Sequence, residues 1–362
     1  MNYAFFNIKY HWQGFGLSRI SLIKTLIMAN LNYTRRLENL QNRRYDPLEH
    51  RVVNLSESFS KAYIPENLKY LIESMRPIDK KYNDKTLEAA DNVMGHLERG
   101  LQLSFNRDYR KQGSVMAGTH IKLYSDVDLL AIINDYCFLE PALCPPQSPY
   151  QGVPSSDIES LRTQATAILK RQYDDVDDSG TKSIAIFNKN LRRKVDVVFS
   201  FWYNTTEYEQ RRNEYFRGIY LFDFPKKSKI LDYPFAHINN INQKGDSTND
   251  GSRKGIRLLK TLKADSEADI KLNSFQLTTI VHNIDNSSLY YYTSRELDIA
   301  KVMSLEMNRL ITDSTYRKSV KSPNGIENPL SDDACITCLK ALKRDLDLLI
   351  EDCNGEAKNL FY

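Results

Sequence analysis

Two aspartates, Asp126 and Asp128, stand two positions apart at the start of a short apolar run, residues 127–133. The run is rich in aliphatic and β-branched residues, which predicts a buried strand. Side chains at positions i and i+2 of a strand point to the same face, so we expect the two carboxylates to lie side by side. Such a pair repels itself unless a cation neutralises it. The expected cation is Mg²⁺, with Mn²⁺ as an alternative, because it prefers hard oxygen ligands and also binds substrate phosphates.

A third aspartate, Asp196, is the only acidic residue of a second β-like run, residues 192–199. Residues 183–187 and 194–201 are expected to form a hairpin, which would place Asp196 on a strand beside the first one. Three carboxylates together can hold two metal ions about 3.5–4 Å apart, which clamp the attacking and leaving oxygens of a phosphoryl transfer. A lone Asp-x-Asp is more often a turn or a solvated face, so the third carboxylate matters to the hypothesis.

A turn formed by Gln112, Gly113 and Ser114 precedes these aspartates in the chain. Glycine lets backbone N–H groups approach a triphosphate closely, and the serine hydroxyl can bind a phosphate oxygen. We therefore expect the three residues to hold the phosphates of a nucleotide beside the metal site. A Gly-Ser pair alone carries no such information, but its order and spacing relative to the aspartates do.

A resemblance to a known superfamily rests on four short segments in a fixed order: Gly113-Ser114, Gly118-Thr119-x-Ile121, Ser125-Asp126-Val127-Asp128-Leu129 and Val195-Asp196-Val197-Val198. This order resembles the DNA polymerase β-like nucleotidyltransferases. Its long form is most similar to the bacterial cGAS/DncV-like nucleotidyltransferases of CBASS anti-phage systems and to the oligoadenylate synthases. The resemblance implies a two-lobed fold, Mg²⁺, a cyclic di- or trinucleotide second messenger and a downstream effector that it activates. The implied substrates are ATP, GTP and pyrimidine nucleoside triphosphates.

A basic and strongly helical segment opens at Gly251 and contains Arg253, Lys254, Arg257 and Lys260. The positive end of a helix dipole adds to side-chain cations, so we expect this segment to anchor the triphosphate of a donor nucleotide. The family resemblance also implies basic residues in this helix. The alternative is that these residues form a solvated outer face.

The composition of the 362-residue chain is that of a globular protein, with 41% hydrophobic and 27% charged residues. The formal net charge is only +4, so we expect no constitutive nucleic-acid binding, although a mild basic surplus suits anionic substrates. Five cysteines, an odd number, favour a reducing compartment, and the pair Cys335 and Cys338 lacks the partners of a zinc site. No stretch is long and apolar enough for a membrane span, so the expected location is cytoplasmic.

The predicted architecture is a mixed α/β core followed by a C-terminal helical lobe, with substrates in the cleft between them. Residues 1–27 form a doubtful leader, and Met28 is the expected start. Residues 28–245 form the core with its N-terminal helices, and residues 246–362 form the helical lobe, after a polar linker at 233–250. Helices are expected at 68–75, 86–103, 155–173, 274–281, 297–311 and 334–351, a further strand at 220–224, and a proline-rich lid or surface loop at 140–149.

The site residues predict a Mg²⁺-dependent nucleotidyltransferase with Asp126, Asp128 and Asp196 as catalytic metal ligands, and the family resemblance implies that its product is a cyclic oligonucleotide. One alternative is an enzyme of the same superfamily that modifies a hydroxyl group of an RNA, a protein or a small molecule. The other is a non-catalytic protein that only binds nucleotides. Replacing Asp126 and Asp128 by asparagine separates these alternatives, because turnover that survived the change would mean that the site is assigned wrongly.

Overall fold

The computed structural model describes residues 31–44, 64–123, 125–144 and 150–359. The expected leader, residues 1–27, lies outside the described residues, as do residues 145–149 of the proline-rich loop. The chain divides into two units, Met1–Asn32 and Tyr33–Tyr362, and the described helices and strands all belong to the second.

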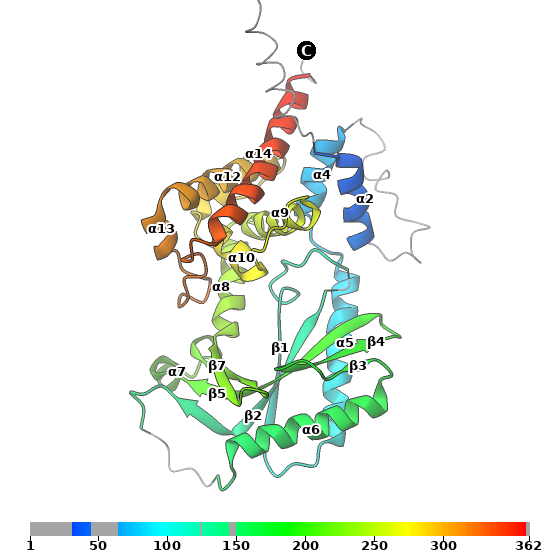
Figure 1. Cartoon of the computed structure of the whole chain (residues 1–362), viewed down its shortest axis with the longest axis vertical. Helices are drawn as coiled ribbons and strands as arrows, with labels where there is room; N and C mark the ends of the chain where they lie inside the picture. Colours follow the sequence, from blue (N-terminus) through cyan, green and yellow to red (C-terminus); the bar gives the residue numbers. More distant parts are fainter. Residues whose placement is uncertain (1–30, 45–63, 124, 145–149, 360–362) are drawn as a thin grey trace, which may run out of the picture. The chain divides into compact units, whose positions relative to one another are not determined.

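The strands of the described residues form one mixed sheet in the order β1-β2-β5-β4-β3, with β6 paired to β5 and β7 to β6. They are β1 (Arg107–Gln112), β2 (Val127–Leu139), β3 (Val176–Asp177), β4 (Ser183–Asn188), β5 (Arg193–Asn204), β6 (Gly218–Asp223) and β7 (Ser228–Asp232). β2 and β5 run parallel, and the other neighbouring pairs are antiparallel. The predicted hairpin is confirmed as β4 and β5, and the predicted strand at 220–224 as β6 (Figure 1).

The helices fall into two groups (Figure 1). α5 (Lys80–Gly100) and α6 (Pro154–Gln172) cover one face of the sheet, and α7 (Thr206–Arg211) and the 3₁₀ helix η1 (Glu214–Phe216) lie between β5 and β6 in the chain. The helical lobe contains α2 (Tyr33–Arg44), α4 (Glu66–Met75), α9 (Gly251–Asp265), α10 (Ser274–His282), α11 (Asn286–Leu289), α12 (Glu296–Thr312), α13 (Ser314–Ser319) and α14 (Cys335–Asn359). α8 (Pro234–Ser247) connects the sheet to this lobe.

Both faces of strand β2 are buried over its first half, which explains its continuous apolar sequence. Its odd-numbered residues from Val127 to Ile133 pack against α5 and α6. The even-numbered Leu130 and Ile132 belong to a second cluster on the opposite face, together with Trp202 of β5. Because side chains alternate along a strand, Asp128 shares this second face and points away from both helices.

The N-terminal helices α2 and α4 pack in the helical lobe and not, as predicted, with the core of residues 28–245. Arg36 of α2 forms a buried ion pair with Asp345 of α14, with 2.8 Å between Nη2 and Oδ2. The Tyr70 hydroxyl of α4 donates a hydrogen bond to Asp265 at the end of α9, at 2.8 Å. An amphipathic pattern shows that a helix has an apolar face but not which partner covers it, so the sequence could not reveal this arrangement.

The predicted linker at 233–250 is wrong, because most of it forms helix α8. Pro234 stands in the first turn of that helix, where its missing N–H breaks no hydrogen bond. The break between α8 and α9 instead lies at Asn249 and Asp250, which have positive φ angles of 48° and 69°. A helix therefore joins the two lobes, and tertiary packing outweighs the low helix propensity of its asparagines.

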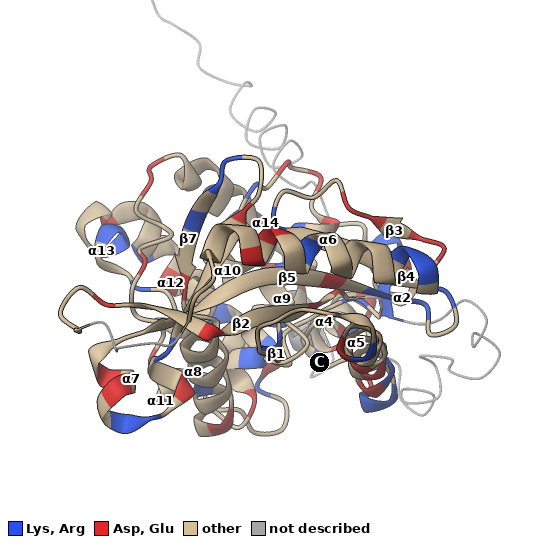
Figure 2. Cartoon of the chain, turned by 90° about the horizontal axis from the view of Figure 1, so that it is seen from below, with Lys and Arg blue, Asp and Glu red and all other residues tan. Residues whose placement is uncertain are grey.

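The other predicted helices are confirmed with shifted ends. α5 begins at Lys80, earlier than expected, where the Asp79 side chain accepts a hydrogen bond from the Lys81 amide. α6 begins at Pro154, one residue earlier than expected, and has no side-chain cap. None of the described helices has the length and hydropathy needed to cross a membrane. Figure 2 shows basic and acidic residues interspersed over the helices and strands, in keeping with the small net charge.

Candidate active site

The parallel pairing of β2 and β5 places Asp128 directly beside Asp196. Neighbouring strands lie about 4.8 Å apart, and residues in register project from the same face, so the two carboxylates are neighbours. Asp126 comes just before the first residue of β2, at the same end of these strands. The structure thus brings the three predicted carboxylates together at one end of the parallel pair.

Lys194, which the sequence reasoning did not single out, contacts two of these aspartates. Its Nζ lies 3.1 Å from Asp126 Oδ2 and 2.9 Å from Asp196 Oδ2. Burial lowers the pKa of Lys194, but the hydrogen bonds to the two carboxylates outweigh burial and raise this pKa above its ordinary value. Lys194 stands two positions before Asp196, and this strand spacing is the signal that could have revealed it.

The charged form of Asp128 is disfavoured where this residue lies. Burial, together with the nearby Asp196 and Asp126 carboxylates, raises the pKa of Asp128 to about 6. Burial also raises the pKa of Asp196. Adjacent acids with raised pKa values mark a place where a bound cation would be favourable.

The turn predicted at residues 112–114 is present beside Asp128. Gln112 is the last residue of β1 and the register partner of Asp128, and its Nε2 lies 3.5 Å from Asp128 Oδ2. Gly113 has a φ of +104°, a conformation that favours glycine, and a Cβ atom there would lie 3.5 Å from Asp128 Oδ2. Hydrogen bonds from Met116 N to Gly113 O and from Thr119 N to Ser114 O close the turn, at 3.2 and 3.0 Å.

A pocket of about 250 Å³ contains this turn and Asp128 and is lined by residues of both lobes. Lys260 of α9 lines it, and its Nζ donates a hydrogen bond to the Thr119 carbonyl at 3.1 Å. Burial, and then the charge of Arg257, lower the pKa of Lys260 to about 8. Of the four basic residues that the sequence analysis names in this segment, Lys260 is the one that lines the pocket.

The other wall of the pocket comes from β7, α8 and α10. Asp232, the last residue of β7, lines it, and its Oδ1 accepts a hydrogen bond of 2.7 Å from the Tyr233 amide. Burial raises the pKa of Asp232. His237 of α8 and Phe275 of α10 also line the pocket, with 5.2 Å between their ring centroids. No sequence signal marked Asp232, because it belongs to no motif.

Arg253 and Lys254 do not line the pocket, so its geometry gives no support to their predicted role as phosphate anchors. The Arg253 guanidinium lies 2.9 Å from Asp246 Oδ1 on α8. Lys254 Nζ lies 4.0 Å from the centre of the Tyr291 ring and 3.8 Å from Glu296 Oε1. Both side chains therefore bind residues of α8, or of the α11–α12 region, outside the pocket lining.

The N-terminus of α9 is also occupied within the protein. An added Cβ at Gly251 would lie 1.7 Å from the Leu289 carbonyl oxygen, so the two backbones are in close contact. The Ser252 amide donates a hydrogen bond to the Thr248 hydroxyl at 3.0 Å. At Gly251 and Ser252, groups of the protein itself therefore occupy the place where the sequence predicted a phosphate.

The donor set at this site fits a divalent cation in kind, because three carboxylates supply hard oxygen ligands. As the side chains stand in the described residues, no group of three or more His, Cys, Asp and Glu is arranged to hold a metal ion. The half-exposed Asp126 is bound to Lys194, whose ammonium supplies the positive charge between Asp126 and Asp196. Metal binding by the three aspartates stays a prediction.

Several relatives and solved structures are similar to this chain over most of its length, whereas no family model matches it. The chain is 35% identical over 299 residues to the cyclic dinucleotide synthase CdnE of Yersinia aleksiciae. This match covers 80% of this chain and 78% of that protein. It is 31% identical over 359 residues to the c-di-GMP synthase of a Lachnospiraceae bacterium (strain RUG226), and this match covers 90% of this chain and 100% of that protein. The structure of a STING-associated CdnE c-di-GMP synthase from Capnocytophaga granulosa matches at a TM-score of 0.76 and 30% identity, covering 90% of this chain and 99% of that one. The predicted fold class is confirmed.

Proposed function

The chain belongs to the cGAS/DncV-like nucleotidyltransferases, whose members similar to it synthesise cyclic dinucleotides, and we propose that it joins two GTP molecules into cyclic di-GMP. The predicted nucleotidyltransferase activity is confirmed by this membership. The proposal of GTP as substrate has two supports: relatives named c-di-GMP synthases, and the carboxylate of Asp232 in the pocket wall.

The observation that carries the proposal is the pairing of Asp128 with Asp196, because Asp128 lines the same pocket as the Gly113–Ser114 turn. In each of two transfers, a ribose hydroxyl oxygen of one nucleotide attacks the α-phosphorus of the other. The bond from that phosphorus to the β-phosphate oxygen breaks, pyrophosphate leaves, and the hydroxyl proton passes to water. The second transfer closes the ring, so one cyclic product is made with two pyrophosphates.

The site residues divide these tasks between them. Asp126, Asp128 and Asp196 would hold Mg²⁺, which when bound lowers the pKa of the attacking hydroxyl and neutralises the departing pyrophosphate. The backbone at Gly113 and the Ser114 hydroxyl bind phosphate oxygens. Lys260 adds a positive charge to the same pocket, where burial strengthens its attraction for the triphosphate.

Asp232 is suited to select guanine. Guanine presents two adjacent donors, N1–H and the exocyclic amino group, and a carboxylate accepts both, whereas adenine presents an acceptor at N1. The hydrogen bond from the Tyr233 amide fixes the Asp232 carboxylate. A buried carboxylate left without partners is costly, so adenine in the same place would bind less well.

The test is incubation of the purified protein with each labelled nucleoside triphosphate, alone and in mixtures, with Mg²⁺ or Mn²⁺. The expected result is a phosphatase-resistant product from GTP alone, with the mass of cyclic di-GMP. A phosphatase-resistant product of another mass would overturn the choice of GTP as substrate but would still support cyclic oligonucleotide synthesis. No product in any mixture, with and without added RNA or phage lysate, would favour the macromolecule-modifying or the non-catalytic alternative.

We further propose that the product acts in anti-phage defence through an effector that binds a cyclic dinucleotide. The support is that the similar c-di-GMP synthase from Capnocytophaga granulosa is STING-associated. Cells that carry this chain together with a cyclic-dinucleotide-binding effector should form fewer plaques on phage infection. Cells with the D126N/D128N variant and the same effector should lose this protection, and equal plaque numbers in both would contradict the proposal.

A further inference from the structure

We propose that Arg257 is a positioning residue that holds the phosphate-binding turn, residues 113–119, in its working place. The proposal rests on the function proposed above, since it concerns the same turn. Arg257 lies on α9 in the helical lobe and is 1% exposed. Its Nη1 donates a hydrogen bond of 2.7 Å to the carbonyl of Gly118, which belongs to the sheet lobe. A side chain of one lobe thus reaches the turn of the other.

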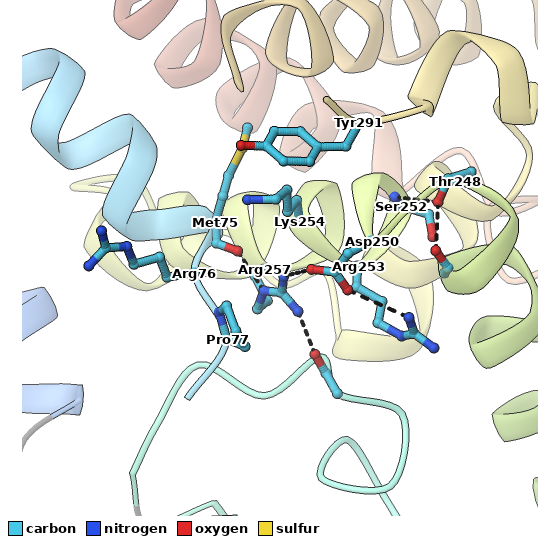
Figure 3. Close-up of polar contacts among 12 residues, drawn as sticks. Met75, Arg76, Pro77, Thr248, Asp250, Ser252, Arg253, Lys254, Arg257 and Tyr291 are labelled. Carbon is cyan, nitrogen blue, oxygen red and sulfur yellow. Dashed lines mark hydrogen bonds and ion pairs between the residues drawn. The ribbon is translucent and has the colours of Figure 1, made fainter. Parts of the chain in front are cut away.

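The Arg257 guanidinium bonds three separate parts of the chain at once (Figure 3). Besides Gly118, its Nε donates to the Met75 carbonyl at the end of α4, at 2.7 Å, and its Nη2 to Asp250 Oδ2, at 2.5 Å. The carbonyls at the end of a helix have no partner within the helix, so Met75 needs a donor of this kind. Asp250 balances the buried charge, which alone would be costly.

Two further side chains of the connecting helix and the helical lobe hold the same turn. Lys260 stands three positions after Arg257 on α9, and so on the same face, and it donates to the Thr119 carbonyl at 3.1 Å. Asn242 of α8 donates to the Met116 carbonyl at 3.4 Å. Three carbonyls of the turn, at residues 116, 118 and 119, therefore accept hydrogen bonds from side chains of α8 and α9.

Gly118 and Thr119 are in turn hydrogen-bonded to the part of the turn that is proposed to face the nucleotide. The Thr119 amide donates to the Ser114 carbonyl at 3.0 Å, and the Gly118 amide donates to the Val115 carbonyl at 3.2 Å. A shift of the Gly118–Thr119 segment would therefore move Ser114. Misplacing a reacting group by about 1 Å can cost on the order of a hundredfold in rate, so this coupling matters for turnover.

The test replaces Arg257 by lysine, which keeps the charge but cannot reach three acceptors that lie in different directions. Arg317 is a matched control: it is also 1% exposed, belongs to the helical lobe, and binds the Leu310 carbonyl and Asp333 without any contact to the turn. Amide hydrogen exchange of residues 113–119 is measured for both variants and the unchanged protein. We expect exchange in the turn to become about tenfold faster in R257K and to stay unchanged in R317K.

Steady-state kinetics give the second readout. We expect R257K to lower kcat for pyrophosphate release by about tenfold or more and to change the KM for GTP by less, because the turn is misplaced relative to the metal site. R317K should keep kcat at temperatures where it is folded. If R257K does not fold, N242A provides the same test through Met116, with a smaller effect expected from a longer hydrogen bond.

Equal exchange of the turn in R257K and the unchanged protein, or equally increased exchange in R317K, would overturn the positioning role. Exchange is measured without turnover, so it decides the inference even if the unchanged protein makes no cyclic dinucleotide. That last result would count against the proposed function alone. An exchange increase that spreads evenly over α9 and α4 would also overturn the inference, since it would mean that Arg257 stabilises the lobe and not the turn.

Discussion

Lys194 Nζ lies 2.9 Å from Asp196 Oδ2, and the two residues share one face of β5 at the end where the three aspartates gather. Their contact places a positive charge where the proposed function needs a divalent cation. The ammonium and a metal ion would then compete for the same carboxylate oxygens. Both partners of this ion pair are partly exposed, which limits its strength to about 1 kcal/mol.

The K194M variant should therefore bind Mn²⁺ about three- to tenfold more tightly than the unchanged protein. Binding is measured as free Mn²⁺ by electron paramagnetic resonance, without nucleotide. The control is K189M, which removes a lysine paired with Asp174 on the surface, at 3.0 Å, away from the three aspartates. Unchanged affinity in K194M would contradict competition between the ammonium and the metal.

The D126N and D128N changes should each lower pyrophosphate release by on the order of a hundredfold or more, because an amide cannot supply the negative charge that holds the cation. D128N should also leave the melting temperature equal or higher, since it removes a buried charge that Asp196 and Asp126 repel. Release assays and thermal melts on the same preparations check both statements. A loss of activity that followed a loss of folding would contradict the assignment.

The D232N change should reduce the preference for GTP over ATP by about tenfold, since the amide can accept only one of the two guanine donors and offers its own donor to adenine. Competition between the two nucleotides, with products weighed by mass spectrometry, gives this ratio. The matched control is D223N. Asp223 is a buried aspartate that accepts a backbone hydrogen bond from the Lys226 amide at 3.2 Å but does not line the pocket. If the preference for GTP over ATP changed equally in both variants, Asp232 would have no specific role in base selection.

The G113A change should lower the free energy of unfolding by about 1–3 kcal/mol, because a φ of +104° is unfavourable for alanine. It should also reduce turnover, since the backbone must relax beside Asp128. Denaturant unfolding and kinetics check the two effects. A Gly355→Ala change is the control, as glycine there has no neighbour within 4 Å of an added Cβ and no positive φ.

The buried His120 predicts a loss of stability in acid. Burial, and then the charge of Lys260, lower its pKa to about 4, below the value near 6.5 expected in the unfolded chain. The unfolded chain therefore takes up the proton first, and stability falls as the pH drops from about 6.5 to 4, by up to about 3 kcal/mol from this group. The H120Q variant should lose less stability over this window and show no such difference above pH 7, as measured by denaturant unfolding.

Local features of the site could be predicted from the sequence because residue spacing determines them. Asp126 and Asp128 stand two positions apart and so share a face of the strand. The hairpin that contains Asp196 and the turn at Gly113 also depend on residues that are neighbours in the chain. The role of the basic residues of α9 was harder to predict, because a charged stripe has the same sequence pattern whether its side chains are solvated or buried. Lys260 and Arg257 are only 8% and 1% exposed, and their carbonyl partners lie far away in the sequence.

The sequence could not predict which helices pack together, for a similar reason. The periodic pattern found α4, but most of the helices that it packs against, α9, α12 and α14, come much later in the chain. Asp232 was also missed, because a single aspartate at a strand end is common and only the fold shows that it lines the pocket. Sequence patterns here predicted elements and motifs well, whereas contacts between distant elements needed the structure.

The helical lobe is assembled from both ends of the chain, since α2 and α4 pack with α9 and α14 while the whole sheet lies between them in the sequence. During synthesis, the ribosome therefore delivers the sheet and its three aspartates long before the partners of α2 and α4 exist. Asp265 meets Tyr70 only after about two hundred further residues have been added, and Asp345 meets Arg36 later still. A nascent chain would contain the three aspartates before Lys260 and Arg257 of α9 are made, so the pocket that Lys260 lines cannot be complete until α9 has been synthesised.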